Sequence, residues 1–455
     1  MIGLAPEQIA AEAGAQILAR GPADGHHPER AVIDSRGAGP GDLFVGIAGA
    51  RVDGGQFAAA TLEAGAWGVL VDHRRAARLA DGPWAGRAWI LGCEDPVRAL
   101  ALLARGWRRR LGCPTVGVTG STGKTSVKDI CRVLLPRRTH VTPENYNTEI
   151  GLPLTILAAP EGTEILVLEM AMRGLGQIAD LCEIAEPGVA AITNIGPVHL
   201  ELLGTLEAVA EAKAEILAGL GPEGRAVIPA DAETLEPHLH DALTTFTFGA
   251  GGDVFAERVE RDSAGIKALI GTPHGEAVFE FPFDEEHNLQ NALCAVAIGI
   301  ALGFDPAEMA VRAPEVTFSR LRGERIELRS EIIVLNDCYN ANPISMRAAL
   351  EHLATLEAPR KLAALGGMGE LGPDSAAYHE EVGVLARRLG IEPVIGVGEL
   401  ARGYGPDHWQ HDAAAAGELV VKLLEPGDAL LVKGSRSVGL ELLTDIVAAR
   451  VGSPE

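Results

Sequence analysis

The chain has 455 residues, 47% of them hydrophobic and 22% charged, and a formal net charge of −23. This length exceeds what one hydrophobic core supports, and the composition excludes wholesale disorder. Long-range repulsion from so acidic a chain, with no Lys/Arg-rich tract to offset it, argues against DNA or RNA as a partner. An anionic small molecule held by a few local cations is not excluded.

Cysteine usage and hydropathy bear on where the protein works. The six cysteines are widely spread with no CxxC spacing, which is typical of buried, reduced thiols. The N-terminus lacks a basic segment followed by an apolar one, and the longest apolar run, residues 292–304, is shorter than the ~20 residues that span a bilayer. We therefore expect a cytoplasmic protein with no membrane span. We also expect it to be a monomer.

Strand-like runs alternate with helix-like runs after residue 60, which indicates parallel α/β layers. In chain order the predicted strands are residues 66–72, 115–120, 164–170, 188–196, 331–337, 361–367, 393–398 and 428–435. Residues 246–284 alternate with period two and predict an antiparallel ribbon.

Two breaks in the apolar pattern, at residues 108–114 and 311–325, predict domain joints. They divide the chain into an N-terminal domain (1–111), a central domain (112–313) that contains the ribbon, and a C-terminal domain (314–455). The sequence thus predicts three α/β domains.

The stretch "TVGVTGSTGKTSVKDI" (115–130) has the order strand, small-residue loop, Gly-Lys-Thr, helix. In this layout Gly120 and Gly123 let the backbone wrap a phosphate, Lys124 reaches the terminal phosphates, and the Thr125 hydroxyl is placed for Mg²⁺. The usual P-loop spacing would put its first glycine at Val118, and a chance Gly-Lys-Thr turn is the alternative. The context favours ATP or GTP binding.

An acidic residue ends the apolar run "ILVLE" (165–169). A P-loop needs a second metal partner at the end of a neighbouring strand, and Glu169 stands at such a position. Taken alone, an acid at a strand end is equally a solvated edge residue.

Several motifs occur in an order that resembles the Mur ligase family. They are "TGSTGKTS" (119–126), "NYNTEIGLP" (145–153), "LEMAMRGLGQI" (168–178), "TNIGPVHLELLG" (193–204), "EAKAEIL" (211–217), "HNLQNA" (287–292) and "NDCYNANPISMRAAL" (336–350). "DSRGAGPGDLFVGIAGARVDGG" (34–55), "LGGMGELG" (365–372) and "VKGSRS" (432–437) are similar to the members that add a dipeptide. One departure is that Gly55 stands where the family often has histidine.

The resemblance implies a UDP-sugar-binding domain, a central P-loop ATPase and a Rossmann-like C-terminal domain that closes over the nucleotide. It also implies the reaction. ATP phosphorylates the terminal carboxylate of UDP-MurNAc-tripeptide, and the amine of D-Ala-D-Ala attacks the resulting acyl phosphate. This chemistry belongs to peptidoglycan precursor synthesis.

The resemblance further implies two Mg²⁺ ions beside the catalytic Lys124. Thr125 and Glu169 would hold one ion and His199 the other. Lys213, which by itself reads as a solvated charge on a helix, is carbamylated in similar ligases, and an N6-carboxylysine there would be a further metal ligand.

The predicted ATP-binding residues begin with the loop itself, Gly120, Ser121, Thr122, Gly123, Lys124, Thr125 and Ser126. His287, Asn288 and Asn291 open an apolar helix and can offer polar groups to the adenine edge. Simple N-capping by Asn288 is the alternative.

The C-terminal domain is expected to add further nucleotide contacts. The resemblance places an arginine, either Arg322 or Arg325, against the nucleotide and Asp337 against the ribose. Tyr339 and Asn340 follow at the carboxyl end of that strand, where open α/β sheets bind ligands.

The remaining residues are assigned to the acceptor and the dipeptide by resemblance. Ser35 and Arg36 match a UDP-binding signature, and Arg173 is similar to a residue near the peptide or metal centre. The other assignments are Asn145, Asn147 and Thr148 for the muramoyl part, and Lys433, Ser435 and Arg436 for the dipeptide carboxylate.

Four alternative functions stay open at this point. They are a Mur ligase that adds the third peptide residue, a folylpolyglutamate synthase, a small-molecule kinase, and a nucleotide-gated binding protein without turnover. "NANPISMRAAL" (340–350) and "KGSRS" (433–437) argue against the first two.

Overall fold

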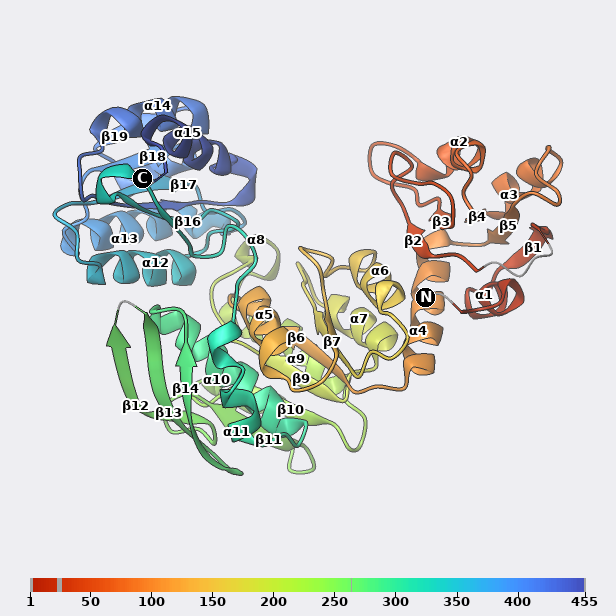
Figure 1. Cartoon of the computed structure of the whole chain (residues 1–455), viewed down its shortest axis with the longest axis horizontal. Coiled ribbons are helices and arrows are strands. Elements are labelled where there is room, and N and C mark those ends of the chain that lie inside the picture. Colours follow the sequence, from red (N-terminus) through yellow and green to blue (C-terminus); the bar gives the residue numbers. More distant parts are fainter. Residues whose placement is uncertain (1–2, 23–26, 263, 454–455) are drawn as a thin grey trace.

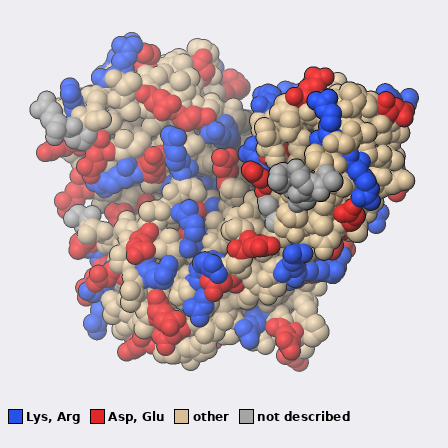
Figure 2. Space-filling view, turned by 45° about the vertical axis from the view of Figure 1, so that its right-hand side comes forward, with Lys and Arg blue, Asp and Glu red and all other residues tan. Residues whose placement is uncertain are grey.

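The computed structural model describes residues 3–22, 27–262 and 264–453 and arranges them as three α/β bodies (Figure 1). The predicted fold class, with a mostly parallel central sheet, an antiparallel ribbon and a Rossmann-like C-terminal part, is confirmed. No helix in the described residues is long and apolar enough to cross a membrane. On the face shown in Figure 2, acidic and basic side chains are interspersed rather than gathered by sign.

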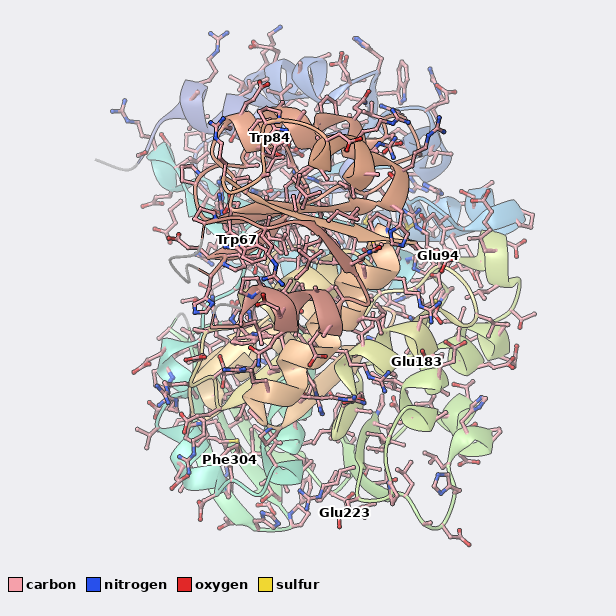
Figure 3. All side chains as sticks on the ribbon, turned by 90° about the vertical axis from the view of Figure 1, so that its right-hand side faces the viewer. Trp67, Trp84, Glu94, Glu183, Glu223 and Phe304 are labelled. Carbon is pink, nitrogen blue, oxygen red and sulfur yellow. The ribbon has the colours of Figure 1, made fainter. Side chains whose placement is uncertain are left out.

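The N-terminal sheet has the strand order β1-β5-β4-β3-β2, and only β1 runs antiparallel to its neighbour. Side chains alternate across β4, so Val69 packs in one core and Leu70 in the other. Trp84 and Trp67, labelled in Figure 3, belong to these two cores in the same way. The elements are β1 (Gln16–Ala19), β2 (Arg30–Val32), β3 (Asp42–Val45), β4 (Gly68–Asp72), β5 (Trp89–Cys93), α1 (Pro6–Glu12), α2 (Ala58–Glu63), α3 (His73–Ala80) and α4 (Pro96–Leu111).

The central sheet is wholly parallel, in the order β11-β10-β9-β6-β8-β7. Helices cover both faces, which explains why its strands are continuous apolar runs. The strands are β6 (Thr115–Thr119), β7 (Thr139–Val141), β8 (Ile165–Glu169), β9 (Val189–Ile192), β10 (Arg225–Pro229) and β11 (Thr244–Phe248). The helices are α5 (Lys124–Leu134), α6 (Gly151–Ala158), α7 (Gln177–Ala185), α8 (Leu200–Leu203), α9 (Leu206–Ala218), α10 (Glu286–Ala301) and α11 (Pro306–Ala310).

The predicted ribbon is a separate three-stranded antiparallel sheet, β12 (Phe255–Asp262), β13 (Gly265–Thr272) and β14 (Gly275–Phe281). Its predicted start was wrong, because residues 246–248 belong to the parallel strand β11 of the central sheet. Its inward-facing aromatic side chains, Phe279 and Phe281, share the core that α5 and α10 form on one face of the central sheet. The ribbon therefore extends the central body rather than forming an independent unit.

The C-terminal sheet has the order β15-β16-β20-β17-β18-β19, with β15 antiparallel and the rest parallel. Helices α12 and α13 cover one face and α14 and α15 the other. The elements are β15 (Glu324–Glu327), β16 (Ile333–Asp337), β17 (Lys361–Gly366), β18 (Val394–Val397), β19 (His408–Gln410), β20 (Ala429–Lys433), α12 (Pro343–Thr355), α13 (Ser375–Arg388), α14 (Ala413–Leu423) and α15 (Glu441–Val451).

Helix α4 joins the N-terminal and central bodies without a break in packing. Its Trp107 is fully buried and donates from Nε1 to the Ala159 carbonyl at 3.1 Å, and one apolar core runs across both bodies. Three arginines of α4, Arg105, Arg108 and Arg109, pair with Glu186 at the end of α7. The predicted domain boundaries at 111/112 and 313/314 stay predictions.

The segment between the central and C-terminal bodies is laid along α5. Arg312 donates to the Val133 carbonyl at 2.6 Å, Ser319 donates to Asp129 from both its amide and its hydroxyl, and Arg322 reaches Thr125. These partners on α5 are spaced four residues apart and so share one helix face. The segment therefore follows α5 from its C-terminal end to its N-terminus.

Candidate active-site cleft

A cleft of about 1300 Å³ opens where the carboxyl ends of the central strands face the C-terminal body. Most of the predicted site residues line it. They are Ser121, Thr122, Gly123, Lys124, Thr125, Ser126, Asn145, Asn147, Thr148, Glu169, Arg173, His199, His287, Asn288, Asn291, Arg322, Asp337, Tyr339, Asn340, Lys433, Ser435 and Arg436. Gly120, Lys213, Ser35 and Arg36 are not among the lining residues.

The glycine loop is a tight cradle between β6 and α5. A Cβ on Gly120 would collide with Thr193 and one on Gly123 with Asn291, and both glycines have positive φ, +147° and +79°. Because α5 begins at Lys124, the free N–H groups of its first turn point into this cradle. The Lys124 Nζ donates to the Gly120 carbonyl at 2.6 Å, across the space that an anion would fill.

Oxygen ligands converge beside the loop. The Thr125 Oγ1 donates to Glu169 Oε2 at 2.9 Å, and Asn147 Nδ2 donates to Glu169 Oε1 at 2.7 Å. The Glu169 side chain ends β8 next to β6 and is 3% exposed, so the solvated-edge alternative is wrong. A hydroxyl and a carboxylate in a cleft are the hard oxygen donors that suit Mg²⁺, and these residues fit that ion.

His199 is the N-cap of α8, has a left-handed φ of +54° and contacts the C-terminal body. Its Nδ1 lies 2.5 Å from Glu370 Oε2, and Glu370 Oε1 lies 3.5 Å from Arg173 Nε. Burial lowers the pKa of His199, whereas the Glu370 carboxylate raises it.

The structure corrects the expectation that Lys213 is a solvated charge, which was drawn from its neighbours on the helix. Rather than a solvated charge, it is a buried side chain, 2% exposed, with no ion-pair partner in the described part of the chain. Burial, reinforced by the charge of Lys124, holds the pKa of Lys213 well below its ordinary value. Burial of this kind disfavours the charged ammonium relative to the neutral amine.

The start of α10 forms the far wall of the cleft. Its N-cap is Glu285, so capping by Asn288 is wrong. Instead, Asn288 Nδ2 donates to Glu285 Oε2 and Asn291 Nδ2 donates to Asn288 Oδ1, each at 3.2 Å. This relay orients the two amides, while burial lowers the pKa of His287 beside them.

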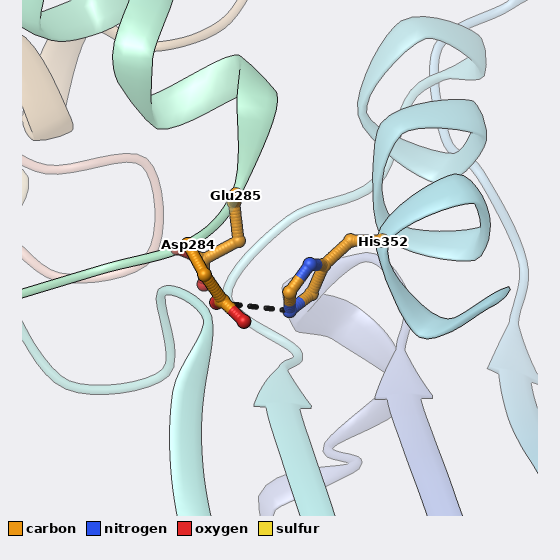
Figure 4. Close-up of side chains that lie close together, drawn as sticks. All are labelled: Asp284, Glu285 and His352. Atoms are coloured by element: carbon orange, nitrogen blue, oxygen red, sulfur yellow. Dashed lines mark ion pairs between the residues drawn. The ribbon is translucent and has the colours of Figure 1, made fainter. Parts of the chain in front are cut away.

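A second contact between the bodies lies behind this wall (Figure 4). The His352 ring of α12 faces Asp284 at 3.7 Å, and Glu285 stands beside them. Ligand atoms of all three residues lie within 4.8 Å of one another. The imidazole and two carboxylates are a donor set that metals accept.

Of the two candidate arginines, the structure brings Arg322 into the cleft. Its Nη2 lies 3.2 Å from Thr125 Oγ1, and its guanidinium carbon lies 4.0 Å from the centre of the Tyr339 ring. Arg325 pairs with Glu327 on β15 and is not part of the lining.

The residues predicted to bind the dipeptide have hydrogen-bond and ion-pair partners within the protein. Lys433 is 2% exposed and donates to Asp337 Oδ2 at 2.5 Å and to the Asn340 carbonyl at 3.1 Å. Ser435 accepts the Gly369 N–H at 3.0 Å, and Arg436 pairs with Glu441. Lys433 therefore fixes the loop after β16, while Ser435 and Arg436 face the cleft.

The two N-terminal candidates lie on a loop of the first body. Arg36 donates to Asp34 at 2.9 Å from Nε, and this hydrogen bond lowers the pKa of the exposed Asp34 carboxyl to about 2. The structure does not bring Ser35 or Arg36 together with the other site residues.

Sequence reasoning missed three residues that shape the cleft. Asn194 accepts the Thr122 N–H at 2.9 Å, and the Thr193 hydroxyl donates to the Thr122 carbonyl. The polar pair directly after strand β9 was a usable signal for both. Glu370 had no local signal, because its contacts come from another body.

Comparisons with known proteins agree with this geometry. Three family models match in chain order: the Mur ligase family catalytic domain (residues 30–108), the Mur ligase middle domain (118–299) and the Mur ligase glutamate ligase domain (321–436). A UDP-N-acetylmuramoyl-tripeptide–D-alanyl-D-alanine ligase of Bacillus subtilis (strain 168) is 36% identical over 92% of this chain and 93% of its own.

Solved structures extend the likeness to the whole architecture. MurF from Acinetobacter baumannii superposes with a TM-score of 0.86 at 28% identity over 98% of both chains. MurF ligase from Thermotoga maritima, in complex with ADP, gives 0.82 at 30% identity over 93% of this chain and 97% of that one. With the P-loop cradle, its converging oxygen ligands and three matched domains in place, this chain belongs to the Mur ligase family.

Proposed function

We propose that this protein is the ATP-dependent ligase that joins D-Ala-D-Ala to UDP-MurNAc-tripeptide in peptidoglycan precursor synthesis. The observation that carries the proposal is one cleft in which a P-loop, a Mg²⁺-type oxygen pair and loops of the C-terminal body face each other. Relatives at 30% identity or more that span over nine-tenths of the chain bear the name UDP-N-acetylmuramoyl-tripeptide–D-alanyl-D-alanine ligase.

The reaction needs two anions, the peptide carboxylate and the ATP γ-phosphate, to approach each other. Lys124 at the loop would neutralise the terminal phosphates, and Arg322, held flat against Tyr339, would add a second fixed cation. Thr125 and Glu169 would hold Mg²⁺, which would screen these charges. Phosphorylation turns the carboxylate oxygen into a leaving group, and the dipeptide amine then displaces phosphate from the acyl carbon.

The outer parts of the substrates are assigned by position. Ser35 and Arg36 on the N-terminal body would hold the UDP end, and Asn145, Asn147 and Thr148 the muramoyl part, with Arg173 next to the peptide. His287, Asn288 and Asn291 would face adenine, and Asp337, Tyr339 and Asn340 the nucleoside. We assign Ser435 and Arg436 to the dipeptide, with Lys433 shaping their loop.

We further propose that Lys213 carries a carbamate and, with His199, contributes to a second Mg²⁺ site. Only the neutral form of an amine adds CO₂, and burial favours that form at Lys213; the carbamate would place an anion next to the cation of Lys124. Protein incubated with ¹³C-bicarbonate should show one carbamate carbon signal, and Lys213→Ala should lack it. A bare ammonium in wild-type protein saturated with CO₂ would contradict this assignment.

The alternatives make different products. A third-residue-adding ligase would use a single amino acid, a folylpolyglutamate synthase would use glutamate, a kinase would release ADP without any amine, and a binding protein would not turn over. The names carried by the relatives favour the dipeptide ligase over all four.

The deciding experiment measures phosphate release and new amide with UDP-MurNAc-tripeptide and ATP in three arms. D-Ala-D-Ala should give both products, omission of an amine should give neither, and free D-Ala should give far less amide. Equal amide formation with D-Ala and the dipeptide would overturn the proposal.

A further inference from the structure

The contact between His199 and Glu370 joins two bodies at a residue assigned to metal binding. Resting on the function proposed above, we propose that Glu370 is the positioning residue of that ligand. It fixes the His199 ring so that the metal site is complete only when the C-terminal body is docked.

The first support is the geometry of the ring. Glu370 Oε2 lies 2.5 Å from Nδ1, and His199 makes no other side-chain hydrogen bond in the described part of the chain. Occupation of Nδ1 by a carboxylate leaves Nε2 as the nitrogen available to an ion. Metal-binding histidines almost always donate their other N–H to a carboxylate or carbonyl, which sets the tautomer and the ring orientation.

The second support is the backbone conformation of the two residues in contact. His199 and Glu370 are non-glycine residues with left-handed φ values, +54° and +62°. Each such conformation costs on the order of 1 kcal/mol and persists only where its surroundings impose it. Both residues that form this contact, His199 and Glu370, therefore have strained backbone conformations.

The third support is a close approach next to the contact. The turn formed by residues 369–372 reaches α8, where the Glu370 carbonyl accepts the Glu201 N–H at 3.4 Å. Gly372 has a φ of +66°, and a Cβ on it would lie 3.2 Å from the Glu201 backbone. A side chain at this position would be strained and would press on the Glu201 backbone, so the docked position of Glu370 depends on backbone as well as side chain.

The consequence is a coupling between metal affinity and docking of the C-terminal body. If docking orients His199 and so strengthens binding of the ion, then by thermodynamic linkage the ion strengthens docking by the same factor. Loss of an outer carboxylate of this kind weakens metal binding about 10- to 100-fold. Through Glu370, the affinity for the second ion thus depends on whether the C-terminal body is docked.

The experiment uses the full-length protein with Mn²⁺ in place of Mg²⁺ and a non-hydrolysable ATP analogue, with bound Mn²⁺ followed by electron paramagnetic resonance. His199→Ala identifies the class of Mn²⁺ that depends on the histidine. Glu370→Gln, which keeps the side-chain volume, should weaken that class about 10- to 100-fold and leave the other class unchanged. Glu380→Gln, a change at an exposed glutamate of α13, is the matched control and should leave both classes unchanged.

A double-mutant cycle separates positioning from a general effect on folding. In the His199→Ala background, Glu370→Gln should change Mn²⁺ binding no further. Hydrogen exchange of residues 369–372 supplies the reciprocal readout: Mn²⁺ with nucleotide should protect this turn in the wild type and not in His199→Ala.

The outcomes distinguish this inference from the proposed function. Two results would overturn the positioning role while the ligase assay above still stood. One is that Glu370→Gln leaves the affinity of the histidine-dependent Mn²⁺ class unaltered. The other is that Glu370→Gln weakens Mn²⁺ binding in the His199→Ala background as much as in the wild type. If His199→Ala loses no class of Mn²⁺, both the metal role of His199 and this inference fail.

Discussion

At the scale of single residues, Lys213 and Glu169 show how far sequence reasoning reaches. Glu169 was predictable because the strand that carries it ends beside the P-loop strand, and both facts are local. The burial of Lys213 was not, because its helix neighbours are acidic and its burial comes from packing of α9 under the sheet. Glu370 lay beyond prediction for the same reason: only docking of two bodies brings it to His199.

Lys124 should be indispensable. Its Nζ is the only described side-chain cation that hydrogen-bonds residues 120–123, so Lys124→Met removes charge at the point where phosphate charge develops. We expect ligation to fall by about 100-fold or more, with an unchanged melting temperature. Steady-state phosphate release checks this, and Lys422→Met, at an exposed position on α14, should keep full activity.

Arg322 should not tolerate lysine. Its planar guanidinium both stacks on Tyr339 and reaches Thr125, and an ammonium cannot do both. We expect Arg322→Lys to raise the KM for ATP about tenfold, equivalent to about 1.4 kcal/mol. Arg325→Lys changes an exposed side chain outside the cleft and should leave the KM unchanged.

At the scale of elements, most strands were predictable because the parallel sheets are covered on both faces and their strands are continuous apolar runs. The tertiary attachments between elements were not. Glu186 is an example, since three arginines of α4 converge on it from residues about 80 positions earlier in the chain. No periodic pattern encodes such a contact.

This attachment predicts a pH-dependent stability. Hydrogen bonds from Arg109 and then Arg105 outweigh the opposing effect of burial and lower the pKa of the Glu186 carboxyl to about 2. A carboxyl whose folded pKa is depressed stabilises the protein above its unfolded pKa, and this contribution is lost as pH falls toward the folded pKa. Glu186→Gln should therefore cost about 2 kcal/mol of unfolding free energy at pH 7.

The difference between wild type and Glu186→Gln should shrink as pH is lowered from about 5 toward about 2. Urea denaturation at a series of pH values measures it. Glu183→Gln, at an exposed residue of the same helix labelled in Figure 3, is the control. A difference that stayed constant across this range would show that the arginines do not act through the charge of Glu186.

At the scale of the whole molecule, the predicted three-domain α/β fold is confirmed, whereas the boundaries drawn from the two breaks in the apolar pattern stay predictions. The mutual arrangement of the three bodies was not readable, because it depends on contacts such as His199 with Glu370 and His352 with Asp284. The cleft is the product of that arrangement. Residues of both the central and the C-terminal bodies line it.

Gly323 lies where the segment along α5 ends and β15 begins, and it has a φ of +68°. A Cβ there would lie 3.2 Å from Glu285 Oε1, at the joint itself. We expect Gly323→Ala to lower stability by about 1 kcal/mol and, in addition, to reduce ligation. Gly303→Ala is the matched control: its φ is +88° with open space around it, so stability should fall alike while ligation is kept.

The path of residues 312–322 along α5 has a consequence for cutting the protein into pieces. A fragment that stops at residue 313 loses Ser319 and Arg322, which brace the helix that starts at Lys124. A segment that looks like a spacer therefore contributes Arg322 to the lining of the cleft and is anchored on α5 up to the point where β15 begins. One residue inserted into this segment would shift the later contacts, Ser319 with Asp129 and Arg322 with Thr125, out of register with the turns of α5. The inserted residue itself would contact neither substrate.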